Sequence, residues 1–366
     1  MLAEILATSL EHFGWNESWN TQFTAHRKAG WQPGRVAVED KHHYEVLTPN
    51  GLVLAQIPGK FFHQAGSASD LPKVGDWVAL ELLPETGRAM IRALLPRQSQ
   101  LTRKLPGRTT ERQILAANID VAFAIQALDE SFNLRRLERF LIMVHESGAR
   151  TVAVLNKSDL CTDLDARIEK VRTIARDIPI VAASARTGKG LGELRKLTVP
   201  GQTVVFLGPS GVGKSSLINR LFGEKIQDTV EVRDSDAKGR HTTTWRELIP
   251  LPSGAVVIDT PGMREFHLLS ADDGLADTFA DIEALSVNCR FRDCRHQDEK
   301  DCAVKAAVER GEISKDRHLS HTKLQKELEK VGAAEQKRKW IERRRQTNAA
   351  KSAFHRSKPT EHTHDD

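Results

Sequence analysis

The feature that most constrains this chain is a glycine-rich stretch, Gly208 to Ser215, whose letters GPSGVGKS fit the phosphate-loop pattern G-x-x-x-x-G-K-[ST]. It directly follows residues 203–207, an apolar, β-branched run with the composition of a buried strand. Residues 215–221 after it have the pattern of a helix. A strand, a glycine-rich loop and a helix in this order are what a phosphate loop requires. The sequence therefore predicts an α/β fold that binds a nucleotide, and this context disfavours a glycine-rich turn without a ligand.

The phosphate loop assigns a role to each kind of group in it. The helix that follows would aim unpaired N–H groups and the positive end of its dipole at a bound anion. Lys214 would reach the β- and γ-phosphates, and the Ser215 hydroxyl would bind Mg²⁺. The residues expected around the phosphates are Gly208, Pro209, Ser210, Gly211, Val212, Gly213, Lys214, Ser215 and Ser216.

Length and composition place the chain among multidomain globular proteins. At 366 residues, two or three domains are expected, and 39% apolar with 28% charged residues is typical of a soluble protein. No run approaches the roughly 18 apolar residues of a membrane span. The N-terminus has acidic residues early and no secretion signal. We expect a monomeric, cytoplasmic protein without a membrane partner.

The N-terminal third predicts a leader followed by a small barrel. Residues 1–33 contain three tryptophans but no clear periodicity, so they form a leader of open role. Residues 34–100 contain five short β-like runs separated by turn residues: 35–38, 44–47, 51–55, 77–80 and 88–91. Such a pattern is typical of an OB-like β-barrel, a common nucleic-acid binder. A barrel that only packs against its neighbour is the alternative.

Residues 101–268 alternate between strand and helix. After a polar connection at 102–110, apolar runs at 119–125, 151–155 and 178–183 predict strands. Helical spacing at 134–145 and 168–174 places helices between them. This order predicts a parallel sheet covered by helices on both faces.

Two loops at the carboxyl ends of these strands are expected to hold the base, because ligands of open α/β sheets bind at that edge. The first is Asn156-Lys157-Ser158-Asp159. The Asp159 carboxylate can accept from the N1–H and exocyclic amine of guanine, and the Asn156 amide can address the other edge of the ring. Adenine would leave Asp159 without donors, which costs on the order of 2 kcal/mol or more. The second loop, which begins at Ser184 and Ala185, would close over the base.

Two motifs after the phosphate loop are expected to sense the γ-phosphate. The first is Gly239 to Thr244, with the letters GRHTTT, which is typical of a mobile switch. One of its threonines, taken as Thr243, is expected to complete the Mg²⁺ shell. Asp259-Thr260-Pro261-Gly262 follows a predicted strand at 255–258. Asp259 suits the second shell of Mg²⁺, and the Gly262 N–H suits the γ-phosphate.

The motifs NKSD, SARTGKG, GPSGVGKS, HTTT and DTPG resemble the five nucleotide-binding motifs of Ras-type GTPases, but the base-reading pair comes first. That order resembles the circularly permuted GTPases. With a barrel before it and a Cys/His cluster after it, the chain resembles the ribosome small-subunit-dependent GTPase A family over residues 34–330. The resemblance implies a bacterial enzyme that hydrolyses GTP to GDP and phosphate late in maturation of the small ribosomal subunit. It further implies binding to that subunit and its rRNA, and stimulation by the subunit.

The residue after Gly262 is Met263, where many Ras-type enzymes carry the glutamine that orients the attacking water. Intrinsic hydrolysis is therefore expected to be slow. His241, beside the switch threonines, is the nearest candidate for positioning the water, and the resemblance points to the same residue. With Lys214 and Thr243 it makes up the predicted catalytic set. The alternative is a histidine that only contacts solvent or RNA.

A metal site is predicted near the C-terminus. Cys289, Cys294, His296 and Cys302 form a Cys₃His set, which is typical of tetrahedral structural zinc without an open position. The flanking residues are polar, so metal is expected to order the segment, one ion per chain. Cys161 stands alone and is left unassigned, and His318 and His321 are expected at the surface because the ligand set is already complete.

Residues 269–330 are thus assigned to a helical zinc-binding domain, and residues 331–366 to the end of a basic helix and a polar tail. The pattern from 315 to 345 is helical and highly charged, with basic triplets at 337–339 and 343–345. Such clusters are often only solvated, but beside a barrel and a zinc module they favour RNA contact, with an affinity that falls with salt.

Two other functions compete with that of a ribosome-associated GTPase. The first is an ATP-dependent phosphate-loop protein, which Asp159 disfavours. The second is a GTP-gated RNA-binding scaffold in which hydrolysis only resets binding. The sequence does not separate this scaffold from the main interpretation.

Overall fold

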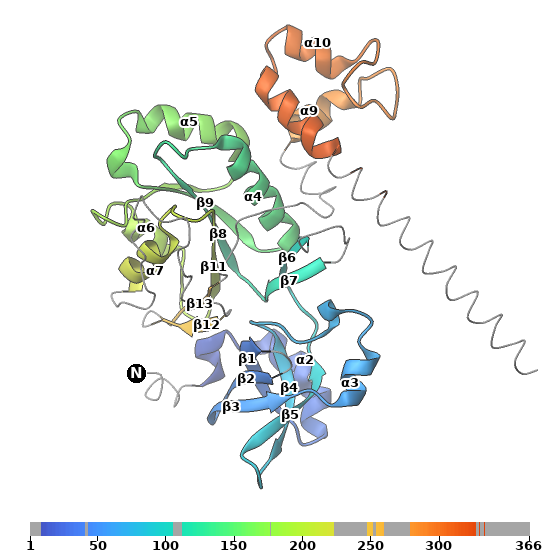
Figure 1. Cartoon of the computed structure of the whole chain (residues 1–366), viewed down its shortest axis with the longest axis vertical. Coiled ribbons are helices and arrows are strands. Elements are labelled where there is room, and N and C mark those ends of the chain that lie inside the picture. Colours follow the sequence, from blue (N-terminus) through green and yellow to red (C-terminus); the bar gives the residue numbers. More distant parts are fainter. Residues whose placement is uncertain are drawn as a thin grey trace, which may run out of the picture.

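The computed structural model describes residues 9–40, 43–104, 112–175, 177–222, 247–251, 254–259 and 279–326, with residues 329 and 333. Figure 1 shows a barrel at one end of the molecule, a sheet with helices in the middle and a small helical part at the other end. No helix in the described ranges is long and apolar enough to cross a membrane. The predicted fold class, an OB-like barrel, a phosphate-loop α/β fold and C-terminal helices with a Cys/His cluster, is confirmed.

The barrel closes as predicted. Its strands pair in the order β1-β2-β3-β5-β4, and an additional pairing of β1 with β4 completes the ring. One 3₁₀ turn, η2 (Ala68–Asp70), and a short helix, α3 (Gly59–Gln64), connect β3 to β4. Each of the five predicted runs lies within one strand: β1 (Gln32–Asp40), β2 (His43–Thr48), β3 (Gly51–Gln56), β4 (Trp77–Leu83) and β5 (Arg88–Leu94).

The leader is part of the barrel's packing. It forms a 3₁₀ turn, η1 (Leu10–Phe13), and a helix, α2 (Glu17–Lys28), which Asn16 caps by accepting from the Trp19 N–H at 3.2 Å. Trp19 and Phe23 are buried from α2, and the ring of Trp15 lies edge-on to that of Trp77 at 4.8 Å. Aromatic burial of this kind is a large apolar contribution, so α2 covers the barrel wall.

The α/β sheet has the order β10-β9-β8-β11-β13-β12, in which only β12 is antiparallel to its neighbour. Alternate residues of β8 face opposite layers of helices: Val121 and Phe123 lie in the same apolar cluster as α6 and α7, whereas Ala122 lies in that of α4 and α5. The sheet with both faces covered is therefore confirmed. Its elements are β8 (Val121–Ala127), α4 (Leu134–Ser147), β9 (Arg150–Asn156), η3 (Ser158–Leu160), α5 (Leu164–Ala175), β10 (Ile180–Ala182), α6 (Leu191–Lys196), β11 (Thr203–Leu207), α7 (Lys214–Phe222), β12 (Glu247–Pro250) and β13 (Val256–Asp259).

The expected polar connection at 102–110 is only partly a connection. Its first residues belong to β6 (Gln100–Lys104), which pairs antiparallel with β7 (Arg112–Ala117) in a two-stranded sheet. The Arg103 side chain donates to Gln113 across the pair at 3.0 Å. The β6 strand was not predicted because its side chains are mostly polar. Its pairing with β7 depends on partners such as Gln113, ten positions from Arg103, and not on local apolar alternation.

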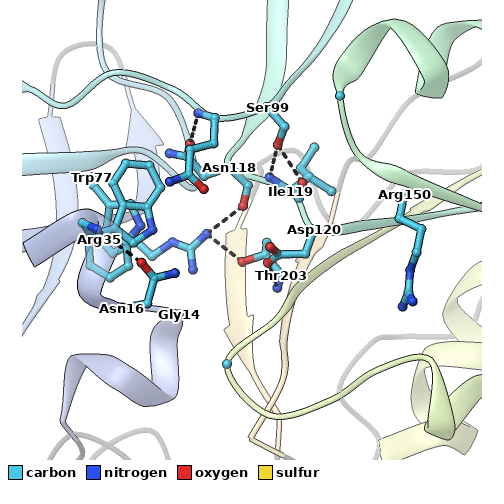
Figure 2. Close-up of a pocket in the computed structure, with 14 residues that line it drawn as sticks. Gly14, Asn16, Arg35, Trp77, Ser99, Asn118, Ile119, Asp120, Arg150 and Thr203 are labelled. Carbon is cyan, nitrogen blue, oxygen red and sulfur yellow. Dashed lines mark hydrogen bonds between the residues drawn. The ribbon is translucent and has the colours of Figure 1, made fainter. Parts of the chain in front are cut away.

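A buried arginine on β1 joins the leader, the barrel and the α/β sheet (Figure 2). Arg35 is 1% exposed and donates to the Phe13 and Gly75 carbonyls, to the Asn118 carbonyl at 3.1 Å and to Thr203 Oγ1 at 2.7 Å. Burial lowers the pKa of Arg35 to about 10, so the guanidinium stays charged at neutral pH. A polar cavity of about 310 Å³ adjoins it. Thr203 begins β11, and the phosphate loop follows the other end of that strand. Arg35 therefore fixes the barrel to the end of β11 that lies opposite the phosphate loop.

The C-terminal part packs on α4. Its helices are α9 (Ala280–Ser286), α10 (Ala303–Glu309) and a helical stretch at 315–326. Ile142 of α4 lies in the apolar core of this part. Arg317 bonds the Asp281 carboxylate at 2.6 Å and reaches Glu138 of α4 at 3.4 Å, all in partly buried positions. The predicted charged helix is thus present over 315–326, and its first turns hold the C-terminal part against the α/β sheet.

Candidate nucleotide site and metal cluster

The phosphate loop lies between β11 and α7, as its sequence predicts, and two of its glycines have no room for a side chain. A Cβ on Gly208 would lie 2.6 Å from the Ile125 carbonyl oxygen. Gly213 has a φ of +91°, and a Cβ there would lie 2.4 Å from Asn156 Nδ2. At Gly213 only glycine tolerates both the positive φ and the close approach, and at Gly208 only glycine leaves room for the Ile125 carbonyl.

Lys214 begins α7, and its ammonium lies against the loop itself. Nζ donates to the Gly208 carbonyl at 2.8 Å and to the Pro209 carbonyl at 3.0 Å. Ser215 and Ser216 follow in the first turn of the helix, half-buried, while Ser210 and Gly211 are exposed at the tip of the loop and Val212 is buried beneath it. The loop therefore presents a helix start, an ammonium group and two hydroxyls at one edge of the sheet.

Asn156 ties the phosphate loop to both predicted base loops. It ends β9 and is 1% exposed. Its Nδ2 donates to the Val212 carbonyl at 2.7 Å, and its Oδ1 accepts from the Ala185 N–H at 3.3 Å. One amide thus joins three loops that are far apart in the sequence, and its predicted contact with the base stays a prediction.

Asp159 lies at the opening of the same region with its side chain 17% exposed. Its Oδ1 accepts from the Ser184 hydroxyl at 2.6 Å, and the exposed Arg186 guanidinium lies 3.8 Å from its Oδ2. Ser184 is fully buried and also accepts from the Thr187 N–H, which fixes the turn of its loop. Ser158 is buried between Lys157 and Asp159. The residues predicted to read the base therefore converge.

One residue near this site was missed from the sequence. Asp129, just after β8, forms an ion pair with Lys157, with Oδ2 and Nζ 2.7 Å apart. Burial raises the pKa of Asp129, but hydrogen bonds from Lys157 and Ser131 outweigh it and hold the pKa at about 2. Its position at the carboxyl end of a predicted strand was the available signal.

The predicted switch residues His241 and Thr243, together with Gly262, lie outside the described residues. Asp259 is described only through its backbone, as the last residue of β13, where it pairs with Glu247 of β12. The strand that carries it lies next to β11, the strand that leads into the phosphate loop. The structure thus places the Asp259 backbone one strand from that loop.

The four predicted metal ligands lie together. The sulfur atoms of Cys289, Cys294 and Cys302 and a ring nitrogen of His296 all lie within 4.8 Å of one another. His296 Nδ1 is 3.4 Å from the sulfur of Cys302 and 3.6 Å from that of Cys289. The backbone at His296 has a φ of +58°, a value uncommon for a residue with a side chain. This turn brings the imidazole to the thiols.

The chemistry of the cluster fits a bound cation. Burial raises the pKa of Cys294 to about 12, against a hydrogen bond from the His296 backbone that lowers it, and a thiolate at this position is favoured by a cation beside it. Burial lowers the pKa of His296, which favours the neutral imidazole that binds metals. His318 donates from Nε2 to the His296 carbonyl at 2.7 Å. The surface prediction for His321 was wrong: it is 1% exposed, and its ring packs 5.1 Å from that of Phe279.

Comparison with known families gives two matches. Residues 94–269 match the model described as RsgA GTPase, and residues 203–340 match that described as 50S ribosome-binding GTPase. A protein from Opitutus terrae, named small ribosomal subunit biogenesis GTPase RsgA, is 44% identical over 328 residues, 87% of this chain and 89% of that protein. One from Lactiplantibacillus plantarum, named small ribosomal subunit biogenesis GTPase RsgA 2, is 47% identical over 299 residues, 82% of this chain and 84% of that protein.

Solved structures give the same fold. The crystal structure of YjeQ from Thermotoga maritima superimposes with a TM-score of 0.59 at 29% identity, covering 81% of this chain and 98% of that one. YloQ, described as a circularly permuted GTPase, has a TM-score of 0.58 at 24% identity, with 82% and 96% covered. Along the chain, β9 and β10, each followed by a predicted base loop, precede β11 and the phosphate loop, which agrees with a permuted chain.

Proposed function

Because this chain belongs to the RsgA GTPase family and is a GTP hydrolase, we propose that it hydrolyses GTP on the small ribosomal subunit late in maturation of that subunit. The observation that carries the proposal is the convergence of the phosphate loop and both base loops on Asn156. The curated relatives named above supply the ribosomal context.

Guanine is the base that the loops suit. Asp159, held by Ser184, would accept from two donors of guanine, and Ala185 and Lys157 would enclose the ring. Lys214, Ser215 and the loop N–H groups would hold the phosphates. Ser215, Thr243 and Asp259 would hold Mg²⁺, which would neutralise charge on the phosphates, and the Gly262 N–H would contact the γ-phosphate.

Zinc is the proposed occupant of the cysteine and histidine cluster. Three thiols and one imidazole within 4.8 Å are a donor set that suits tetrahedral Zn²⁺. Cys289, Cys294, His296 and Cys302 would hold the ion, which would fix the segment between α9 and α10. All four donors belong to the protein, so we assign the ion a structural role.

His241 is the proposed residue that positions the attacking water, since Met263 has no group to do so. Binding to the subunit would order His241 and the neighbouring threonines, which raises the rate of hydrolysis. By linkage, the GTP state should favour the subunit and the GDP state should favour release.

Three regions would contact rRNA: the barrel, the zinc segment and the basic stretch beyond residue 330. The proposed division is a leader at 1–33, a barrel at 34–100, a GTPase domain at 101–268, a zinc domain at 269–330 and a tail at 331–366. A monomer acting in the cytoplasm is the proposed state.

Co-sedimentation with purified small subunits tests this proposal. Wild-type protein should pellet with the subunits in a non-hydrolysable GTP analogue and remain largely in the supernatant in GDP. The His241→Ala variant should bind GTP and the subunit but stay bound during incubation with GTP. Equal binding of wild type in GTP analogue, GDP and no nucleotide would refute the coupling.

A further inference from the structure

We propose that Asp129 is a positioning residue for guanine nucleotide binding, which acts by holding the Lys157 side chain in place before the nucleotide arrives. This inference rests on the proposed guanine pocket and adds a residue that lies outside all five nucleotide motifs. It starts from the ion pair between Asp129 Oδ2 and Lys157 Nζ, 2.7 Å apart.

The carboxylate is fixed independently of the lysine. Its other oxygen, Oδ1, accepts from the Ser131 N–H at 2.9 Å and from the Ser131 hydroxyl at 2.5 Å. The loop behind it is also tied down, since the Gln126 amide donates to the Ser131 carbonyl at 3.3 Å. Asp129 therefore presents a fixed negative charge to the ammonium group of Lys157.

The two residues are neighbours because their strands are. Ala127 of β8 pairs with Asn156 of β9, and the Leu128 N–H donates to the Asn156 carbonyl at 2.8 Å. Asp129 and Lys157 each follow immediately after this paired end. Lys157 has a φ of +61°, a conformation uncommon for a lysine, and this turn leads the chain into Ser158 and Asp159.

The direction of the effect follows from entropy. A lysine side chain has many rotamers, and freezing it during binding weakens the affinity. The side chains of Lys157 and Asp129 are 32% and 25% exposed, so their attraction is screened less than that of a fully solvated pair. A lysine already held by Asp129 is ordered before binding. Removing the carboxylate should therefore weaken nucleotide binding.

The test is calorimetric titration of the full-length protein with GDP and Mg²⁺. Asp129→Asn keeps an acceptor for the Ser131 N–H but removes the charge, and it should weaken GDP binding about 5-fold. The matched control is Glu81→Gln, which breaks an exposed ion pair with Arg92 on the barrel and should leave GDP binding unchanged. The thermal midpoints of the two nucleotide-free variants should agree.

A double-mutant cycle identifies the route of the effect. In a Lys157→Met background, Asp129→Asn should cause no further loss of GDP affinity, because the group that it positions is gone. Unchanged or tighter GDP binding by Asp129→Asn would overturn the inference, as would an equal loss in both backgrounds. Failure of the wild type to bind GDP would instead refute the guanine pocket itself.

Discussion

The nucleotide loops, which are the phosphate loop and the two predicted base loops, are held in a different way from the cluster of three cysteines and His296. The nucleotide loops end strands of a sheet that is buried between two large apolar clusters, and Asn156 and Ser184 bond them to one another. The metal segment has a much smaller core, and its donors face each other without backbone strands between them. The predicted nucleotide loops are therefore held in place by the fold itself, whereas an ion bound by the four Cys and His donors would complete the fold of its own segment.

The largest effect is expected at the metal cluster. Cys302→Ser removes a buried ligand that also caps α10, where its sulfur accepts from the Lys305 N–H at 3.4 Å. In zinc-finger peptides, binding of structural zinc supplies about 10–16 kcal/mol of folding free energy at pH 7. The variant should lose the metal, and the segment from 287 to 302 should become sensitive to protease, while GDP binding is retained.

Elemental analysis and limited proteolysis check this result, with Cys161→Ser as the control that keeps one zinc per chain. Cys161 is half-buried in the α/β part, where it packs against the apolar core, and it is far along the chain from the cluster. A Cys302→Ser protein with a full complement of zinc and wild-type protease resistance would show that Cys302 neither binds the metal nor holds the segment.

The next largest effect is expected at the phosphate loop. Lys214→Ala removes the ammonium that would stabilise charge on the transferring phosphate, so turnover should fall at least about 100-fold. The sheet and its two apolar clusters are untouched, so the thermal midpoint should change little. Phosphate release and circular dichroism measure the two quantities, with the exposed Lys60→Ala as the control. Wild-type turnover in Lys214→Ala would remove this loop from the active site.

A smaller change is expected in base choice. Asp159→Asn replaces the proposed acceptor of two guanine hydrogen bonds with an amide, which can donate to the additional carbonyl of xanthine. Preference should shift from GTP toward xanthosine triphosphate by about 2 kcal/mol, or roughly 30-fold. Competition among GTP, ATP, inosine triphosphate and xanthosine triphosphate measures it. An unchanged order of affinities would place Asp159 outside the base pocket.

The smallest effect concerns pH and the Asp129–Lys157 pair. The pKa of Asp129 is lowered in the folded protein to about 2, below the ordinary carboxyl value near 3.9. Its contribution to stability is therefore present above about pH 4 and is lost as the pH falls toward 2. The stability difference between wild type and Asp129→Asn should be below about 1 kcal/mol at pH 6 and vanish near pH 2. Urea titrations at several pH values measure this difference, and one that grows on acidification would contradict the sign.

The elements with strong local signals were predictable. Short apolar runs predicted the five barrel strands, and longer apolar or helical spacing predicted β8, β9, β10 and β11 with α4, α5 and α7, but α6 was not predicted. The grouping of the Gly208–Ser215 loop with the Asn156 and Ser184 loops, and of the three cysteines with His296, was predictable because glycine, asparagine, aspartate and cysteine occur there at spacings that chemistry restricts. The structure brings each of these groups together.

The remaining features depend on contacts between distant residues. Arg35 looked like any strand arginine, yet it bonds carbonyls 22, 40 and 83 residues away. The β6–β7 pair and the burial of His321 arise in the same way, from partners that the local pattern does not contain. Asp129 lies beside Lys157 only because β8 pairs with β9, and the local sequence does not show that pairing.

The proposed function requires that the small ribosomal subunit stimulates GTP hydrolysis by this chain. Its most direct test is GTP turnover by the full-length protein alone, with purified small subunits and with an equal concentration of large subunits. We predict a slow basal rate that rises at least about 10-fold with small subunits and stays at the basal level with large ones, since completing the catalytic geometry is typically worth that much or more. Equal rates under all three conditions would contradict it.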